Sequence, residues 1–322
     1  MRYSPRMASV AFLFPGQGSQ KVGMGAELLE AEGELLAGYL AQAEAASGKP
    51  IRRLCLEGPI EELTRTEVAQ PALFAVALAT ADAARARGIQ PNFVAGHSLG
   101  EYTAACAAGA ISVEDAIELV ALRGRLMGTI GDERPGAMAA IIGLPGDQVS
   151  DLCGQASGDG AVAVANINSP TQIVVSGEED GVVQLMALAE EAGAARVVRL
   201  QVAAAFHSEL MVPVQEQMAD AVAEVAWNEP RVPVAANARG ELVRDAESLQ
   251  AALVEQIASP VRWVECVQAL DAAGADTFLE VGPGRVLGGL VRQIMPGSDF
   301  FSADSPARLD EFADSHPAAV RR

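Results

Sequence analysis

Residues 92–107 read NFVAGHSLGEYTAACA. The segment Asn92–Gly96 predicts a strand, and the alanine-rich run Leu99–Ala107 predicts a helix that follows it directly. Between them Ser98 is the centre of a G-x-S-x-G pattern, in the strand-to-helix context that a nucleophile elbow requires. Small flanking residues permit the sharp turn, and the helix N-terminus offers free N–H groups and a positive dipole end. The pattern therefore favours Ser98 as a nucleophile over an ordinary glycine–serine turn.

The same alternation of short apolar runs and long helical runs extends outward from this segment. Val10–Phe14 and Thr277–Val281 predict strands, and Ala72–Ala86 predicts a buried helix. Ser112 followed by Asp115 resembles a capping box that opens a helix to about Thr129. Strands that alternate with helices are typical of an α/β fold with a mostly parallel sheet.

The order of elements changes between about residues 136 and 200. There the pattern predicts β-α-β-β-α-β, a ferredoxin-like unit, over Gly136–Ile142, Asp147–Gln155, Val162–Asn166, Gln172–Ser176, Glu179–Ala192 and Arg196–Leu200. The polar, turn-rich segment Gly131–Pro135 precedes it, as expected at a boundary. We therefore expect a small domain at 132–203, inserted in a large α/β domain built from 1–131 and 204–322.

The end of the chain is more polar than the rest. From about Met295 onward we expect one short helix after Ser305-Pro306, and we expect Ser315 to Arg322 to be frayed.

Composition excludes several classes of protein. The 322 residues carry 23 Lys+Arg against 42 Asp+Glu, a formal charge of −19, and half of them are hydrophobic. The chain therefore has material for a full core, and its acidic surface disfavours nucleic acid and anionic membranes as general partners. Its 4 scattered cysteines and 3 histidines speak against a Cys/His zinc site. No apolar run is long enough for a membrane span or signal, so we expect a cytoplasmic protein.

A serine nucleophile needs a base, and the 3 histidines narrow the choice. His316 lies in the tail that we expect to be frayed, and His97 is adjacent to Ser98, where neighbouring side chains point apart. His207, in the break between a predicted strand and a helix, is left as the predicted general base. No acidic partner for it stands out, so a backbone or amide carbonyl is expected to orient the imidazole.

Two further features suggest how a substrate is held. The glycine-rich turn Pro15–Gln20 offers backbone N–H groups that, with the N–H of Leu99, suit an oxyanion hole, although the spacing fits a plain tight turn nearly as well. Arg123 and Arg125 lie two positions apart on a predicted helix, so they point about 200° apart and only one can face inward. An inward arginine needs an anion, which suits a substrate with a free carboxylate.

Taken together, these residues resemble the malonyl-CoA:acyl-carrier-protein transacylase family of fatty-acid and polyketide synthesis. The resemblance extends from about Val10 to about Ile294. It rests on seven ordered motifs: Phe14–Gln20, Gly96–Glu101, Arg123-Gly124 with Leu126-Met127, Asn168-Ser169-Pro170 with Ser176-Gly177, Phe206-His207-Ser208, Ser259–Trp263 and Glu280–Gly284.

The resemblance implies a hydrolase-like large domain, a ferredoxin-like small domain and a role for each site residue. It implies that Ser98 is acylated, that His207 is the base and that the main-chain carbonyl of Gln256 orients this histidine. It further implies that the backbone N–H groups of Gln17 and Leu99 hold the oxyanion, that Arg123 rather than Arg125 binds the malonyl carboxylate, and that Phe206 favours malonyl.

The implied enzyme is free-standing and works by a ping-pong mechanism. Malonyl-CoA acylates the serine, and the phosphopantetheine thiol of an acyl carrier protein then removes the malonyl group. The resemblance implies no tightly bound cofactor and no metal. Carrier proteins are usually acidic, so we expect a local basic patch around Arg285 and Arg292 to receive the partner.

Three alternatives stay open from the sequence. The first is a serine thioesterase or esterase on the same framework, the second is a non-catalytic docking subunit, and the third is an acyltransferase for a different acyl unit.

Overall fold

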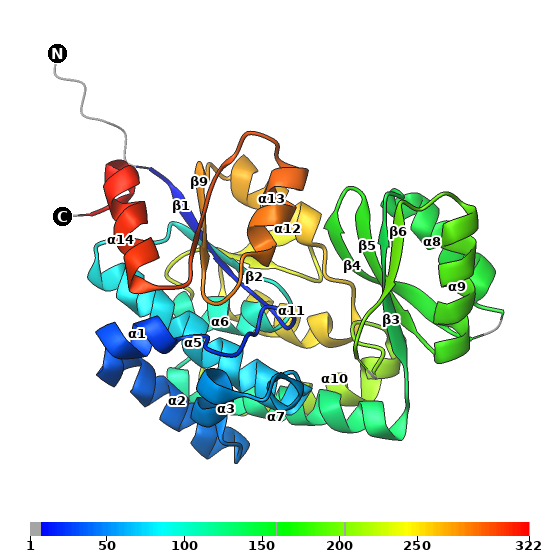
Figure 1. Cartoon of the computed structure of the whole chain (residues 1–322), viewed down its shortest axis with the longest axis horizontal. Coiled ribbons are helices and arrows are strands. Elements are labelled where there is room, and N and C mark those ends of the chain that lie inside the picture. Colours follow the sequence, from blue (N-terminus) through cyan, green and yellow to red (C-terminus); the bar gives the residue numbers. More distant parts are fainter. Residues whose placement is uncertain (1–7, 159, 203, 322) are drawn as a thin grey trace.

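The apolar run Val10–Phe14 forms β1, which lies inside the larger of two sheets (Figure 1). A computed structural model describes residues 8–158, 160–202 and 204–321. The described part leaves out residues 1–7, 159, 203 and 322. The expected domain ends at residues 1, 203 and 322 therefore lie outside it. The larger sheet has the order β10-β9-β1-β2-β7-β8, formed by Asp299–Ala303, Thr277–Val281, Val10–Phe14, Phe93–Gly96, Val234–Ala236 and Glu241–Val243. Its strand pairs are parallel except for β7 with β8.

Helices cover both faces of this sheet, which explains why β1 is apolar throughout rather than alternating. Val10, Phe12 and Phe14 pack into the main core, whereas Ala11 and Leu13 pack into a second core on the opposite face. The main core is built with α2 (Gly33–Ser47), α5 (Thr66–Ala86), α6 (Leu99–Ala107), α7 (Val113–Glu133), α10 (Val212–Ala223), α11 (Ala246–Glu255) and α14 (Pro306–Ser315). The second core is built with α12 (Trp263–Ala272) and α13 (Val286–Ile294).

Short helical segments complete this larger unit. They are α1 (Ala26–Ala31), α3 (Ile51–Glu57), α4 (Ile60–Leu63) and the 3₁₀ turns η1 (Glu209–Met211), η2 (Gln256–Ala258) and η3 (Pro317–Ala319). Ser112 caps α7 by accepting a hydrogen bond from the backbone N–H of Asp115, as predicted. Every helix of the described residues is too short or too polar to cross a lipid bilayer.

The smaller unit is an antiparallel sheet with two helices (right in Figure 1). Its six elements follow in the predicted order as β3 (Ala137–Ile142), α8 (Gly146–Ala156), β4 (Val162–Ser169), β5 (Gln172–Gly177), α9 (Glu179–Glu191) and β6 (Arg196–Arg199). The sheet order is β4-β5-β3-β6, and α8 and α9 share a separate core with one of its faces.

The two units are joined through backbone hydrogen bonds. The N–H of Ile167 in β4 donates to the carbonyl of Val261 over 2.9 Å, and the N–H of Val261 donates to Ala165 over 2.8 Å. Met138 and Ala140 of β3 also pack into the main core of the larger unit. The smaller sheet therefore buries its second face against the larger unit.

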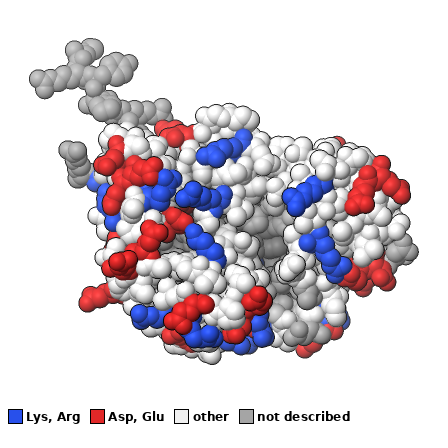
Figure 2. Space-filling view, viewed as in Figure 1, with Lys and Arg blue, Asp and Glu red and all other residues white. Residues whose placement is uncertain are grey.

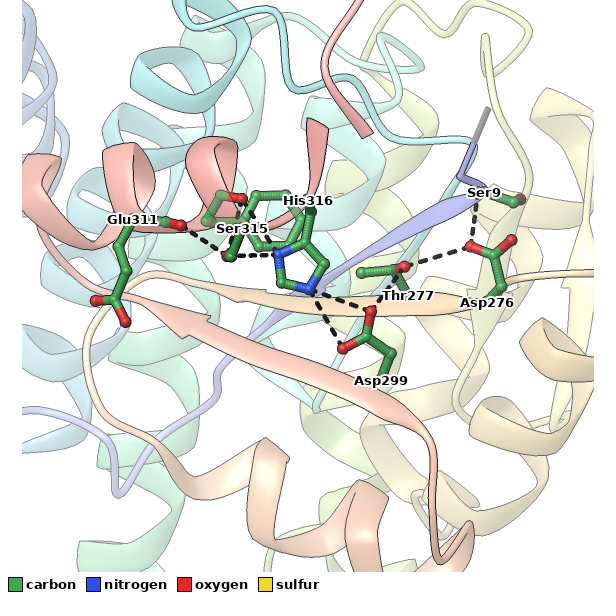
Figure 3. A network of polar contacts seen from close by, with 8 residues as sticks. Ser9, Asp276, Thr277, Asp299, Glu311, Ser315 and His316 are labelled. Carbon is green, nitrogen blue, oxygen red and sulfur yellow. Dashed lines mark hydrogen bonds and ion pairs between the residues drawn. The ribbon is translucent and has the colours of Figure 1, made fainter. Parts of the chain in front are cut away.

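The prediction of a frayed tail is wrong for the described residues Ser315–Arg321. Val320 bridges Ile89, and the N–H of Arg321 donates to Gly88 over 2.8 Å. His316 stacks on Phe312 with ring centroids 4.4 Å apart, and its Nε2 lies 3.2 Å from Asp299 (Figure 3). These contacts tie the tail to the end of α5 and to β10, a strand that the polar segment after Met295 did not suggest.

Candidate active site

Ser98 lies at the sharp turn between β2 and α6. Its backbone has φ 52° and ψ −108°, a left-handed conformation that is costly for a residue with a Cβ. The flanking glycines are required because a Cβ on Gly96 would lie 1.8 Å from the carbonyl carbon of Gly100, and one on Gly100 would lie 2.2 Å from the Phe14 oxygen. Close packing of the turn against β1 therefore holds the Ser98 hydroxyl at the end of the sheet.

His207 faces this serine, although the two residues are 109 positions apart in the chain. The Ser98 Oγ lies 2.7 Å from the His207 Nε2, and the His207 Nδ1 lies 2.9 Å from the main-chain oxygen of Gln256. Because a carbonyl oxygen only accepts, Nδ1 carries the proton and Nε2 is free to accept from the serine hydroxyl. The structure thus brings Ser98, His207 and Gln256 into one chain of hydrogen bonds, with a carbonyl where many hydrolases have a carboxylate.

The protonation state of His207 follows from its surroundings. Its ring is buried, and the positive charge of Arg123 lies nearby, so desolvation first and this charge second lower its pKa to about 3. The imidazole is therefore neutral at pH 7, which is the form that can accept a proton.

Arg123 faces the same serine from α7. Only 1% of its surface is exposed, and its Nη2 lies 3.0 Å from the Ser98 Oγ and 3.0 Å from the Gln256 Oε1. Its Nη1 donates to the Gln70 Oε1 over 2.8 Å. Arg125 is exposed, so the inward-facing arginine is Arg123.

Asn237 and Glu101, to which the sequence analysis gave no role, support the elbow from behind. The Oδ1 of Asn237 accepts from the Ser98 N–H over 2.7 Å, and its Nδ2 donates to the Gly96 oxygen over 2.8 Å. The buried Glu101 accepts from the Gln256 Nε2 over 2.5 Å and from the Asn237 N–H over 3.2 Å. Burial raises the pKa of Glu101 to about 8. Asn237 sits between alanines after a three-residue strand, so nothing in its local sequence marks it.

The side chain of His97 has partners other than Ser98 and His207. Its Nε2 lies 2.8 Å from the Asn168 Oδ1, and its ring packs on Trp263 with centroids 5.4 Å apart. Asn168 and Trp263 both belong to the motifs on which the family resemblance rests. His97 therefore supports the elbow through its packing, and it is not the partner of Ser98.

These side chains surround a cavity of about 320 Å³ where the two units meet. The larger unit contributes Gln17, Ser98, Leu99, Arg123, Phe206 and His207, and the smaller unit contributes Met138, Asn166 and the segment 200–202. Leu99 is the first residue of α6, so its N–H has no acceptor within the helix. Gln17 and Leu99 line this cavity together with Ser98.

A wider outer cavity of about 570 Å³ leads on from this one and shares Gln17, Phe206 and the segment 201–202 with it. It is also lined by Lys49, Arg65 and Arg125. Glu67 lines the same cavity and pairs with both Lys49 and Arg65.

The cysteines and the other side chains that can ligate a metal do not gather at one place in the described residues. All four cysteines are buried and unpaired. Among the residues described, no group of three or more His, Cys, Asp or Glu side chains lies close enough to hold a metal ion.

Comparison with known proteins identifies relatives of the whole chain. The chain is 41% identical over 289 residues to the malonyl CoA-acyl carrier protein transacylase of Bacillus subtilis (strain 168), covering 89% of this chain and 91% of that protein. The crystal structure of the malonyl-CoA:acyl carrier protein transacylase of Xanthomonas oryzae pv. oryzae superimposes with a TM-score of 0.92 at 40% identity, covering 96% and 99% of the two chains. A malonyl-transacylase solved with a type II polyketide synthase acyl-carrier protein gives a TM-score of 0.91 at 36% identity, covering 96% and 100%.

The family model described as "Acyl transferase domain" matches residues 11–298, which include the smaller unit, most of the larger unit and every residue of the Ser98–His207–Gln256 chain. Because the match spans most of the sequence and the relatives cover nearly all of it, the chain belongs to the acyl transferase family.

Proposed function

We propose that this protein moves a malonyl group from CoA to the phosphopantetheine thiol of an acyl carrier protein, through a malonyl ester on Ser98. One observation carries the proposal: the Ser98–His207 pair and the buried cation of Arg123 line a single cavity. The relatives that are malonyl CoA-acyl carrier protein transacylases by name support the same acyl group and partner.

In the first half-reaction His207 acts as the general base. Its Nε2 takes the proton of the Ser98 hydroxyl while Oγ attacks the thioester carbon. The carbonyl of Gln256 keeps Nδ1 protonated and stabilises the imidazolium that forms. The imidazolium then protonates the departing thiolate of CoA.

Negative charge develops on the thioester oxygen during this attack. The N–H groups of Gln17 and Leu99 are the proposed donors, and a single such donor is typically worth roughly 3–4 kcal/mol of barrier. Both donors belong to the main chain, so they are fixed by the turn after β1 and by the start of α6.

In the second half-reaction the carrier's thiol replaces CoA. His207 takes the thiol proton, the thiolate attacks the malonyl ester, and the proton passes to the Ser98 oxygen. Throughout, Arg123 holds the free carboxylate of the malonyl group through charge-assisted hydrogen bonds. Phe206 lines the cavity beside His207 and limits the room around the acyl group.

The two units have separate roles in this proposal. Residues 1–131 and 204–322 form a hydrolase-like large domain that carries the nucleophile and base, and residues 132–203 form a ferredoxin-like small domain that closes the cavity. The separate core of the smaller unit and its β-α-β-β-α-β order support this division.

The carrier protein must approach an acidic enzyme. Arg285 and Arg292 are exposed at α13, and Lys and Arg side chains stand on both sides of the central hollow in Figure 2. We assign carrier docking to this face, where local positive charge offsets the net charge of −19. The reaction uses CoA thioesters and no tightly bound cofactor, and we place it in the cytoplasm.

The experiment compares release of free CoA from malonyl-CoA with and without holo carrier protein. The proposal expects a single burst of CoA without the carrier and sustained turnover with it. Equal sustained rates in both would instead identify a thioesterase. A panel of acyl-CoAs identifies the acyl unit, and a preference for acyl groups without a carboxylate would contradict the role of Arg123.

A further inference from the structure

Arg123 is a buried cation surrounded by neutral acceptors. Its guanidinium contacts the Gln70 Oε1, the Gln256 Oε1 and the Ser98 Oγ. None of the ion pairs among the described residues includes it. The nearby carboxyl of Glu101 is held mostly neutral at pH 7, because burial raises its pKa to about 8. An uncompensated buried charge is unfavourable, so the site is poised to accept an anion.

The two glutamines are held in the orientation that presents oxygen to the arginine. The Gln256 Nε2 donates to the Ser98 main-chain oxygen over 2.9 Å and to Glu101. The Gln70 Nε2 points to the sulfur of Met127 over 3.5 Å. We call Gln70 and Gln256 the neutral cradle of Arg123.

The guanidinium also acts on the base and the nucleophile while it has no counter-ion. Attack by Ser98 moves negative charge onto the thioester oxygen and leaves a positive imidazolium at His207. Arg123 is close enough to His207 to lower the pKa of its ring, so it also disfavours this imidazolium. A hydrogen bond from Nη2 further engages a lone pair of the nucleophilic Oγ.

The unpaired atom of Arg123 shows which edge of the guanidinium has a hydrogen-bond donor to spare. Its Nε–H is buried and has no partner among the described residues, whereas Nη2 already serves two acceptors. A carboxylate that binds the Nε–Nη2 edge in bidentate fashion must draw an Nη2 hydrogen from the Ser98 Oγ or from Gln256. Binding of the anion therefore changes the environment of the nucleophile.

We propose that the neutral cradle of Gln70 and Gln256 keeps Arg123 without a counter-ion, so that the substrate carboxylate activates the Ser98–His207 pair in addition to being bound. This inference rests on the proposed function. Selection for a carboxylated acyl group then operates on the rate of acylation as well as on affinity.

Formate tests this in the wild-type protein. Acetyl-CoA lacks the carboxylate, and free formate can supply one at Arg123. We expect formate to raise the single-turnover rate of Ser98 acylation by acetyl-CoA about tenfold, equivalent to about 1.4 kcal/mol of barrier. A rate that formate leaves unchanged or lowers would overturn the inference.

Gln70→Glu gives the second test because it places a carboxylate beside Nη1, while Gln70→Met is the uncharged control. With an internal counter-ion we expect acetyl-CoA acylation to rise about tenfold, malonyl-CoA acylation to fall, and the formate effect to disappear. Gln70→Met should keep the formate effect. Identical behaviour of the two variants would contradict the inference, and the wild-type formate assay decides the question should either variant fail to fold.

The outcome is separable from that of the proposed function. Malonyl transfer to the carrier without any formate effect would overturn the cradle alone, whereas absence of malonyl transfer would overturn the function. Arg52→Ala, which removes an exposed arginine that lines neither cavity, controls for general effects of charge.

Discussion

Replacing Asn237 by alanine removes the support directly behind the nucleophile. This residue is fully buried, and alanine would leave the Ser98 N–H and the Gly96 carbonyl without their partners at 2.7 and 2.8 Å. Each buried unpaired group costs about 1–3 kcal/mol. The elbow also loses a contact that holds Ser98 at φ 52°, a conformation with strain of order 1–3 kcal/mol. Because relaxation of this strain returns part of the loss, we expect the free energy of unfolding to fall by about 2–4 kcal/mol.

The same change should slow acylation, because the hydroxyl is no longer fixed against His207. We expect the burst rate of CoA release to fall about 10–100-fold, the size of effect expected for a misplaced reacting group. Urea denaturation followed by far-UV circular dichroism measures the stability, and rapid quench with malonyl-CoA measures the burst.

Two further variants sharpen this test. Asn237→Asp keeps an acceptor for the Ser98 N–H but turns an oxygen toward the Gly96 carbonyl, so it should also destabilise the elbow. Asn228→Ala removes an exposed asparagine and should change stability by no more than about 0.5 kcal/mol. If Asn237→Ala matched Asn228→Ala in both stability and burst rate, the reasoning about the elbow would be refuted.

Three other predictions concern protonation and packing. The folded protein holds the pKa of His207 at about 3, below its ordinary 6.5, so the unfolded state binds the proton first as the pH falls. The free energy of unfolding therefore decreases below about pH 6.5, by up to 1.4 kcal/mol per pH unit for this group. In urea titrations from pH 7.5 to 4.5, His207→Gln should lose less stability than wild type, and parallel curves would exclude this cause. The effect of Glu101 on stability has the opposite dependence on pH, because its pKa is raised from 4.5 to about 8. Its contribution to the free energy of unfolding is lost as the pH rises through this range. Glu101→Gln should therefore flatten the decline in stability between pH 5 and 8, and an unaltered slope would assign that decline to other groups. Gly100→Ala would place a Cβ 2.2 Å from the Phe14 oxygen and should lower the free energy of unfolding by about 3 kcal/mol or more. Gly154→Ala, in an open position of α8, should instead raise it by up to about 1 kcal/mol. Thermal melts that rank the two variants the other way would contradict the packing argument.

Much of the fold could be predicted because its signals are local. The run Val10–Phe14, the elbow at Ser98 and the cap at Ser112 each carry their structure in neighbouring residues, and all three are present as predicted. The strands β7 and β8 have only three residues each, too few for a period to show. β10 begins with Asp299 and belongs to a polar segment, for which the sequence predicted no strand. Its pairing with β9 is therefore seen only in the structure.

The residues of the site also differ in whether a local sequence signal marks them. Ser98 could be predicted from its motif, and His207 from the small number of histidines. The choice of Arg123 over Arg125 depended on which helix face is inward, which spacing alone left open. The contacts made by the Gln256 carbonyl, the Asn237 side chain and the Gln70 side chain span 49, 139 and 53 residues of sequence. A main-chain acceptor has no side-chain signature, so only the family resemblance could point to Gln256.

Peptide mass spectrometry of the enzyme during its first turnover detects the proposed ester on Ser98 itself. After mixing with malonyl-CoA, we expect one malonyl group on the peptide that contains Ser98. This group should disappear when holo carrier protein is added, with malonyl-carrier appearing in equal amount, and Ser98→Ala should form no adduct. Transfer to the carrier by the Ser98→Ala variant, or an adduct on any other residue that is discharged at the rate of turnover, would contradict the account.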